Sequence, residues 1–277
     1  NRNEKKHTLC RQNIFYLIAM NTFAEWAPIF EIMRKASQAV LDSYKSDFTV
    51  SSKEDATPVT SADLEANQII MDGLREYYPE IPIISEEIQN SSIEERSSWN
   101  RFFLIDPIDG TSEFVAHQGD FTVNIALIEN GLAVLGFVAV PVTGELFVGN
   151  TQESWVTPLW NKEDFQSRRL IKESWDLNQM NPESKILVSV LHFDQPTEEY
   201  VSSLGGTVLP IGSSLKFCRI ADGTANYYPR LRKLHEWDIA AGHAILKGAL
   251  GNVYLWKTKT ELRYGSSLFE TEPFEAY

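Results

Sequence analysis

A run of four apolar residues leads straight into an acidic turn near the middle of the chain. Phe102–Ile105 is followed at once by Asp106, and Pro107 and Gly110 flank Asp109. The apolar run predicts a buried strand, and the proline and glycine predict an irregular turn at its end. Two carboxylates in such a place repel each other by about 4 kcal/mol at ~4 Å and an effective dielectric constant of about 20. A hard divalent cation would remove this repulsion, and oxygen ligands suit Mg²⁺.

Two other acidic motifs favour a metal site over a simple surface turn, which Asp, Pro and Gly also form. Glu86 and Glu87 follow the apolar residues Ile83–Ile84, so they too lie at a predicted strand end. Each motif alone has a simpler explanation. The two glutamates could form a solvated acidic loop, and Asp238 could cap the helix that it precedes. Taken together, the acidic motifs indicate a Mg²⁺ site.

The acidic composition restricts the partners of the chain. Its 277 residues carry a formal net charge of −13, and nucleic-acid binding needs clustered Lys and Arg, so we expect no nucleic-acid partner. The same field would repel an anionic substrate unless bound cations reversed it locally.

No apolar run approaches the ~20 residues that span a bilayer. The two cysteines, Cys10 and Cys218, predict no disulfide framework and a reducing compartment. We expect a cytoplasmic protein, with association with the inner membrane left open.

Helical and strand patterns alternate along the chain, which favours a layered α/β or α+β architecture. We expect helices at 25–45, 60–78, 213–221 and 236–250, and strands at 81–85, 102–105, 121–129, 132–140, 186–191, 207–211 and 253–256. Asn130-Gly131 predicts a tight hairpin. Residues 151–184 are polar and weakly patterned, so we place a domain boundary there.

The boundary divides the chain into three expected parts. Residues 1–24 form a flexible extension, 25–150 an N-terminal α/β metal-binding domain, and 151–277 a C-terminal α/β domain that completes the substrate site. The extension could precede a natural start at Met20, and a targeting segment is the alternative.

Several motifs together resemble a known family. The matching segments are 58–63 (PVTSAD), 86–87 (EE), 106–111 (DPIDGT), 119–126 (GDFTVNIA), 212–218 (GSSLKFC) and 237–243 (WDIAAGH). They resemble the lithium-sensitive, Mg²⁺-dependent phosphatases related to inositol monophosphatase, and among these the 3′(2′),5′-bisphosphate nucleotidases of the bacterial CysQ type. The resemblance covers roughly residues 25–277 and implies an α+β fold, the layered α-β-α-β-α sandwich of that superfamily.

The resemblance also implies a metal site with two or three Mg²⁺ ions. Glu86, Asp106 and the carbonyl oxygen of Ile108 would hold one ion. Asp106, Asp109 and Asp238 would hold a second. Paired metals suit the in-line displacement of a phosphoryl group, in which positioning and charge stabilisation matter most.

Other roles follow from the same resemblance. Glu86 and Thr111 would orient the attacking water, and Asp63 would support the Thr111 hydroxyl. The backbone N–H groups of Gly110 and Thr111 would receive the phosphate. The residues implied on the substrate side are Ser213, Lys216 and Arg230 at the phosphates and His192 near the base. Taken alone, Lys216 would be interpreted as part of a solvated helix face, and Arg230 and His192 as loop residues.

Two departures from the family pattern concern the substrate. Ser112 stands where the closest relatives usually carry lysine, and Val190 and Leu191 replace polar residues. The resemblance implies a small phosphorylated substrate, with 3′-phosphoadenosine 5′-phosphate hydrolysed to AMP and phosphate. The alternatives are an inositol-phosphate or sugar-bisphosphate phosphatase with the same metals, a catalytically silent Mg²⁺- or nucleotide-binding regulator, and a structural protein with an acidic surface. The oligomeric state stays open.

Overall fold

The computed structural model describes residues 22–46, 49–52, 58–88, 91–96, 98–160, 166–191 and 193–277. Nearly all of the predicted extension, together with Met20 and His192, lies outside these residues. None of the helices in the described part of the chain combines the length and the apolar character that a bilayer-spanning segment needs.

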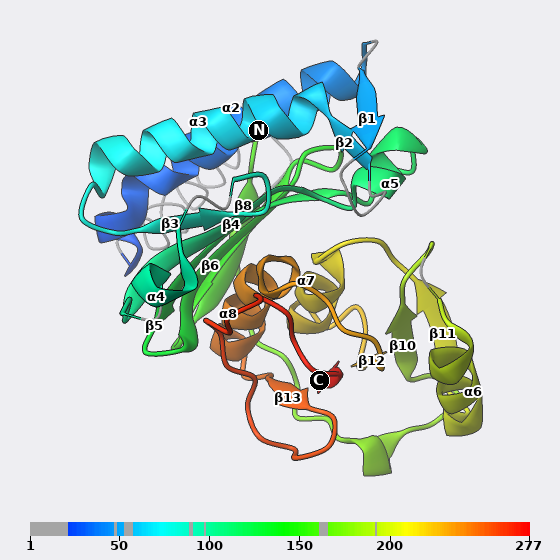
Figure 1. Ribbon diagram of the computed structural model, residues 1–277. Helices are drawn as coiled ribbons and strands as arrows, with labels where there is room; N and C mark the ends of the chain where they lie inside the picture. The colour runs from blue at the N-terminus through cyan, green and yellow to red at the C-terminus, as the bar shows by residue number, and fades with distance from the viewer. Residues whose placement is uncertain are drawn as a thin grey trace, which may run out of the picture.

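Helical and β layers alternate through the molecule (Figure 1). A pair of long helices, α2 (Ala27–Tyr44) and α3 (Ser61–Tyr77), covers one face of the main sheet, and α7 (Leu215–Ala221) and α8 (Ala240–Gly248) cover the other. Beyond α7 and α8 lie two smaller sheets, with α6 (Gln195–Leu204) outside them. The predicted layered α+β fold is confirmed.

The main sheet has seven strands in the order β3-β4-β5-β6-β7-β8-β9. Their bounds are Ile83–Ser85, Arg101–Asp109, Thr122–Glu129, Leu132–Val140, Glu145–Asn150, Ser154–Pro158 and Arg168–Leu170. The two smaller sheets comprise β10 (Lys185–Val188) with β11 (Thr207–Pro210), and β12 (Tyr228–Arg230) with β14 (Phe274–Ala276) and β13 (Val253–Leu255). The short elements are η1 (Ala24–Trp26), β1 (Val50–Ser52), β2 (Pro58–Thr60), α4 (Ile93–Arg96), α5 (Thr111–Val115), η2 (Leu177–Gln179) and η3 (Glu236–Asp238).

Burial on both faces explains why β4 reads as an unbroken apolar run. Phe103 and Ile105 pack with the α2 and α3 side of the sheet, whereas Phe102 and Leu104 pack with the α7 and α8 side. Strand β4 is therefore buried on both faces up to its acidic end.

The predicted long helices and the hairpin are confirmed. Asn130 and Gly131 both have positive φ, +51° and +77°, as a two-residue hairpin turn between β5 and β6 requires.

The main sheet continues past residue 150, because β8 pairs with β7 and β9 pairs with β8. The smaller sheets begin only after Leu170. The main sheet therefore crosses the predicted boundary at residue 150, and the division into two domains stays a prediction.

Helix α8 lies unusually close to the sheet. A Cβ atom on Gly136 of β6 would collide with the carbonyl oxygen of Ala241, and one on Gly149 of β7 would lie 2.5 Å from Cα of Ile245. The glycines therefore set the depth at which α8 packs. They also set the position of the turn η3, which directly precedes this helix.

Candidate active site

The end of β4 is irregular, as its sequence predicts. Asp106 pairs with Asn124 of β5 and Asp109 pairs with Thr122, with a shift of register between the two pairs. The backbone N–H of Ile108 donates to Oδ1 of Asp106 at 3.1 Å. The strand thus bends so that both carboxylates leave it at the same end.

The structure brings Asp106, Asp109 and Asp238 together. One carboxylate oxygen of each lies within 4.8 Å of those of the other two. Desolvation, and then the neighbouring carboxylates, raises the pKa of Asp106 well above its usual range. Desolvation also raises the pKa of Asp109 to about 7, although the positive charge of Lys216 lowers it. Desolvation raises the pKa of Asp238 well above its usual range. The cluster is therefore a concentration of buried carboxylates whose mutual repulsion the nearby cations offset only in part.

These residues fit a hard divalent cation. Oδ2 of Asp106 is buried and accepts no hydrogen bond from any described residue. Every side-chain atom that the cluster offers to a metal ion is a carboxylate oxygen. Oxygen-only ligands are the set that Mg²⁺ takes.

Glu86 stands beside the cluster. It leaves the end of β3, where its backbone N–H donates to the carbonyl oxygen of Ile105 at 3.2 Å. Its charge contributes to the raised pKa values of Asp106, Asp109 and Asp238. The grouping of three carboxylates within 4.8 Å does not include it, so Glu86 flanks the cluster.

Thr111 meets Asp63 at the start of α5. Its hydroxyl lies 3.2 Å from Oδ1 of Asp63 and 3.0 Å from the carbonyl oxygen of Ile108. The other oxygen of Asp63 accepts from the N–H of Thr60 at 2.8 Å and from its hydroxyl at 2.5 Å, which caps α3. Desolvation raises the pKa of Asp63, although these hydrogen bonds oppose it.

A loop from the second half of the chain closes over the same strand end. Ser213 has a φ of +50°, and its hydroxyl donates to the carbonyl oxygen of Asp120 at 2.5 Å. The N–H of Ser214 donates to Oδ2 of Asp109. Gly110, with a φ of +88°, faces this loop, because a Cβ on it would lie 3.4 Å from Cβ of Ser213.

Two buried cations lie near the cluster. Nζ of Lys216 donates to the carbonyl oxygen of Ile211 at 3.1 Å, and desolvation lowers its pKa to about 8 while Asp109 opposes that change. Arg230 lowers the pKa of Lys216 further, so the two cations are electrostatic neighbours. Nη1 of Arg230 donates to Oγ of Ser189 at 2.9 Å. Fixed positive charge therefore adjoins the acidic cluster.

Several polar residues support the site through contacts that the sequence does not predict. Ser214 links Asp109 to β5, because its hydroxyl lies 2.8 Å from that of Thr122 and donates to Oδ1 of Asn124 at 2.9 Å. Asn67 and Ser85, both buried, form a second pair at 2.7 Å. The one available clue was a polar side chain within an apolar strand, as at Asn124.

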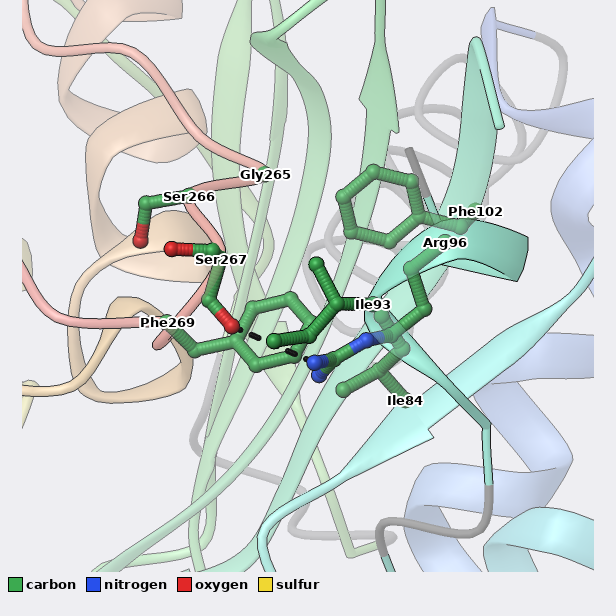
Figure 2. A pocket seen from close by; sticks show the side chains of 8 residues that line it. All are labelled: Ile84, Ile93, Arg96, Phe102, Gly265, Ser266, Ser267 and Phe269. Carbon is green, nitrogen blue, oxygen red and sulfur yellow. Dashed lines mark hydrogen bonds between the residues drawn. The ribbon is translucent and has the colours of Figure 1, made fainter. Parts of the chain in front are cut away.

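A separate cavity of about 90 Å³ lies between α4 and the loop at 265–269 (Figure 2). It is lined by Ile84, Ile93, Arg96, Phe102, Gly265, Ser266, Ser267 and Phe269. The guanidinium of Arg96 lies 4.4 Å from the centroid of the Phe269 ring and donates to the carbonyl oxygen of Ser267 at 3.2 Å. No lining residue carries a carboxylate, so this cavity is not the metal site.

The fold and the acidic cluster define a layered α+β protein with a candidate site for a divalent metal ion, and comparison with known proteins identifies its family. The model of the inositol monophosphatase family matches residues 24–273, so the chain belongs to that family.

Among curated proteins, the chain is 39% identical over 234 residues to the 3′(2′),5′-bisphosphate nucleotidase CysQ of Shigella flexneri, which covers 83% of this chain and 90% of the relative. It is 40% identical over 243 residues to the protein of the same name from Buchnera aphidicola, covering 86% and 87%. Among solved structures, CysQ from Bacteroides thetaiotaomicron is similar with a TM-score of 0.77 and 29% identity, covering 91% of this chain and 96% of that one.

Proposed function

We propose that this protein hydrolyses 3′(2′),5′-bisphosphonucleotides, and that it converts 3′-phosphoadenosine 5′-phosphate to AMP and phosphate with two or three Mg²⁺ ions. In this reaction a water oxygen attacks the phosphorus, the bond from phosphorus to the ribose oxygen breaks, and the ribose oxygen takes up a proton. The single observation that carries the proposal is the buried pair Lys216 and Arg230 beside a three-aspartate cluster. The similarity to the curated nucleotidases supports it.

The proposed ligands divide into two overlapping sets. Glu86, Asp106 and the carbonyl oxygen of Ile108 would hold one ion. Asp106, Asp109 and Asp238 would hold the second. Bound Mg²⁺ would lower the pKa of water and neutralise negative charge on the phosphoryl and leaving oxygens.

The chain itself orients the water. When the Thr111 hydroxyl donates to Asp63, its oxygen keeps a lone pair that can accept a hydrogen bond from the attacking water. The Glu86 carboxylate would accept a hydrogen bond from the other O–H of the water, so that a lone pair of the water oxygen faces the phosphorus. The backbone N–H groups of Gly110 and Thr111 would hold the phosphoryl oxygens.

The cationic pair suits a phosphate that is bound but not cleaved. Charge-assisted hydrogen bonds from Lys and Arg to phosphate are stronger than neutral ones. Lys216 and Arg230 would hold this second phosphate, and Ser213 would add a hydroxyl. His192, which lies outside the described residues, keeps its proposed place near the base.

A phosphate-release screen tests the assignment. The purified protein with Mg²⁺ would be assayed on bisphosphonucleotides, inositol phosphates and sugar bisphosphates. We expect kcat/KM to be at least tenfold higher for the adenosine bisphosphate than for the others. Higher values for inositol 1-phosphate or fructose bisphosphate would reassign the substrate within the family.

Two further assignments belong to the proposal. The part of the chain beyond residue 150 completes the substrate site, since it supplies Ser213, Lys216, Arg230 and Asp238. We also propose a cytoplasmic location, which the use of only two cysteines, with Cys218 buried and free, supports.

A further inference from the structure

One face of helix α3 carries two buried polar residues a single turn apart. Asp63 and Asn67 are 1% and 2% exposed, and their i, i+4 spacing places them on the same side of the helix. Asp63 reaches the hydroxyl of Thr111. Asn67 reaches β3 instead, where its Oδ1 accepts a hydrogen bond from Oγ of Ser85 at 2.7 Å.

The Ser85 hydroxyl fixes the residues that follow it. Its Oγ accepts from the backbone N–H of Glu87 at 3.2 Å, while the N–H of Glu86 donates to Ile105 of β4 at 3.2 Å. The backbone is therefore held on both sides of the Glu86 side chain. Ser85 is fully buried, so no solvent can replace Asn67 as the hydrogen-bond acceptor without a rearrangement.

Helix α3 is itself a firm support. A Cβ on Gly73 would lie 2.6 Å from Cγ1 of Ile32, so α3 packs directly on the side chains of α2. Its first turn is closed by the hydrogen bonds between Thr60 and Asp63. A rigid helix is thus attached at one turn to Thr111 and at the next to the strand end that carries Glu86.

We propose that Asn67 and Ser85 are positioning residues that aim the Glu86 carboxylate at the metal cluster. This inference rests on the proposed function, in which Glu86 is both a metal ligand and a partner of the attacking water. Neither Asn67 nor Ser85 belongs to the proposed metal ligands or substrate-binding residues. The pair acts through Glu86, as Asp63 acts through Thr111, so one helix face would set both groups that orient the water.

The test is a double-mutant cycle on metal affinity. Mg²⁺ binding is measured by calorimetry without substrate for the wild type, Asn67→Ala, Ser85→Ala and the double variant. We expect each single variant to bind Mg²⁺ about 10- to 100-fold more weakly, the usual cost of losing a residue that orients a ligand. We expect the double variant to be no weaker than the worse single one, because both remove the same hydrogen bond.

Ser37→Ala is the matched control. Ser37 is a fully buried serine on α2 whose hydroxyl has no hydrogen-bond partner among the described residues. Its replacement should change Mg²⁺ affinity by less than twofold. Thermal unfolding with and without Mg²⁺ distinguishes a variant that no longer folds from one in which only the orientation of the Glu86 carboxylate is lost.

The possible results distinguish this inference from the proposed function. If Asn67→Ala and Ser85→Ala bind Mg²⁺ as the wild type does, or if their losses multiply in the double variant, the positioning role is overturned and the phosphatase assignment stands. If the wild type binds Mg²⁺ but hydrolyses no bisphosphonucleotide, the substrate assignment fails, while the affinity cycle still decides the role of the pair. A wild type that binds no Mg²⁺ overturns both.

Discussion

The hydroxyl of Thr111 lies 3.2 Å from Oδ1 of Asp63, although the two residues are 48 positions apart in the chain. Asp63 is the third residue of α3 and takes part in its capping box, and Thr111 begins α5, so this contact ties the start of one helix to the start of the other. A capping residue that would be interpreted as purely structural therefore reaches a proposed catalytic group.

Asp106→Asn should abolish turnover and spare the fold. Asp106 belongs to both proposed ligand sets, so we expect kcat to fall at least 100-fold at saturating Mg²⁺. In metal-free buffer the variant should unfold at a higher urea concentration than the wild type, because it removes a desolvated carboxylate from a repulsive cluster. A variant with a tenth of wild-type activity would contradict the shared-ligand assignment.

Calcium should bind to the acidic cluster without supporting hydrolysis. Ca²⁺ accepts longer and looser coordination than Mg²⁺, so it should not hold the water in line. We expect Ca²⁺ to inhibit the Mg²⁺-dependent reaction in a competition assay, and Li⁺ to inhibit at millimolar concentrations or below. Full activity with Ca²⁺ alone would count against the mechanism.

Lys216→Ala should affect substrates with two phosphates selectively. A charge-assisted contact of about 1.5–3 kcal/mol corresponds to a loss of roughly 10- to 150-fold in kcat/KM for the bisphosphonucleotide. Inositol 1-phosphate, with no second phosphate, should be hydrolysed almost as before. Both substrates are measured on wild type and variant.

Lys172→Ala is the control for that comparison. Lys172 is also a buried lysine whose Nζ donates to a backbone carbonyl, that of Glu173 at 3.0 Å, and no proposed ligand contacts it. The Lys172→Ala variant should hydrolyse both substrates with unchanged kcat/KM. Equal losses on the two substrates in Lys216→Ala would show that Lys216 supports the fold or the reacting phosphate.

His243 should make the protein less stable in mild acid. Its ring is buried between the hydroxyl of Tyr264 and Oδ1 of Asn252, each at 2.8 Å, and burial lowers its pKa to about 4. Below the unfolded value of about 6.5, the unfolded chain binds a proton that the folded chain does not. The stability that neutral His243 contributes is therefore complete above pH 6.5 and declines as the pH falls towards 4, by on the order of 3 kcal/mol.

Urea unfolding of the wild type and His243→Gln at pH 7 and pH 5 checks this sign. The difference in unfolding free energy between the two proteins should shift in favour of the variant at pH 5. A difference that is the same at both pH values would show that His243 does not titrate between the folded and unfolded states. Activity serves as a check on the fold, since His243 lies outside the proposed site.

The parts of the fold that local patterns determine could be predicted from the sequence. Helix α2, helix α3 with its Thr60 cap, and the hairpin at 130–131 depend on periodicity, capping and turn chemistry within a few residues. Strands β8 and β9 were missed because residues 151–184 are polar and weakly patterned. Their place depends on pairing with β7, which no local pattern specifies.

The site divides in the same way. The approach of Asp106 to Asp109 follows from one short motif, whereas the arrival of Asp238 depended on family resemblance. The hydrogen bonds of Asn67 and Ser85 could not be predicted, because a single Asn or Ser in a helix or strand is ordinary, and the matched segment 212–218 gave no specific role for Ser214. Their significance lies in which distant backbone or side chain they meet.

The close packing of α8 on Gly136 and Gly149 would make binding of a metal ion at the proposed site depend on complete folding. Asp238 lies on the turn that leads into this helix, and the whole main sheet precedes it in the chain. A chain emerging from the ribosome can form β4 and its two aspartates long before their third partner is synthesised. High-affinity Mg²⁺ binding would therefore appear only when the last large helix has packed, and the metal would stabilise the finished molecule selectively over its folding intermediates.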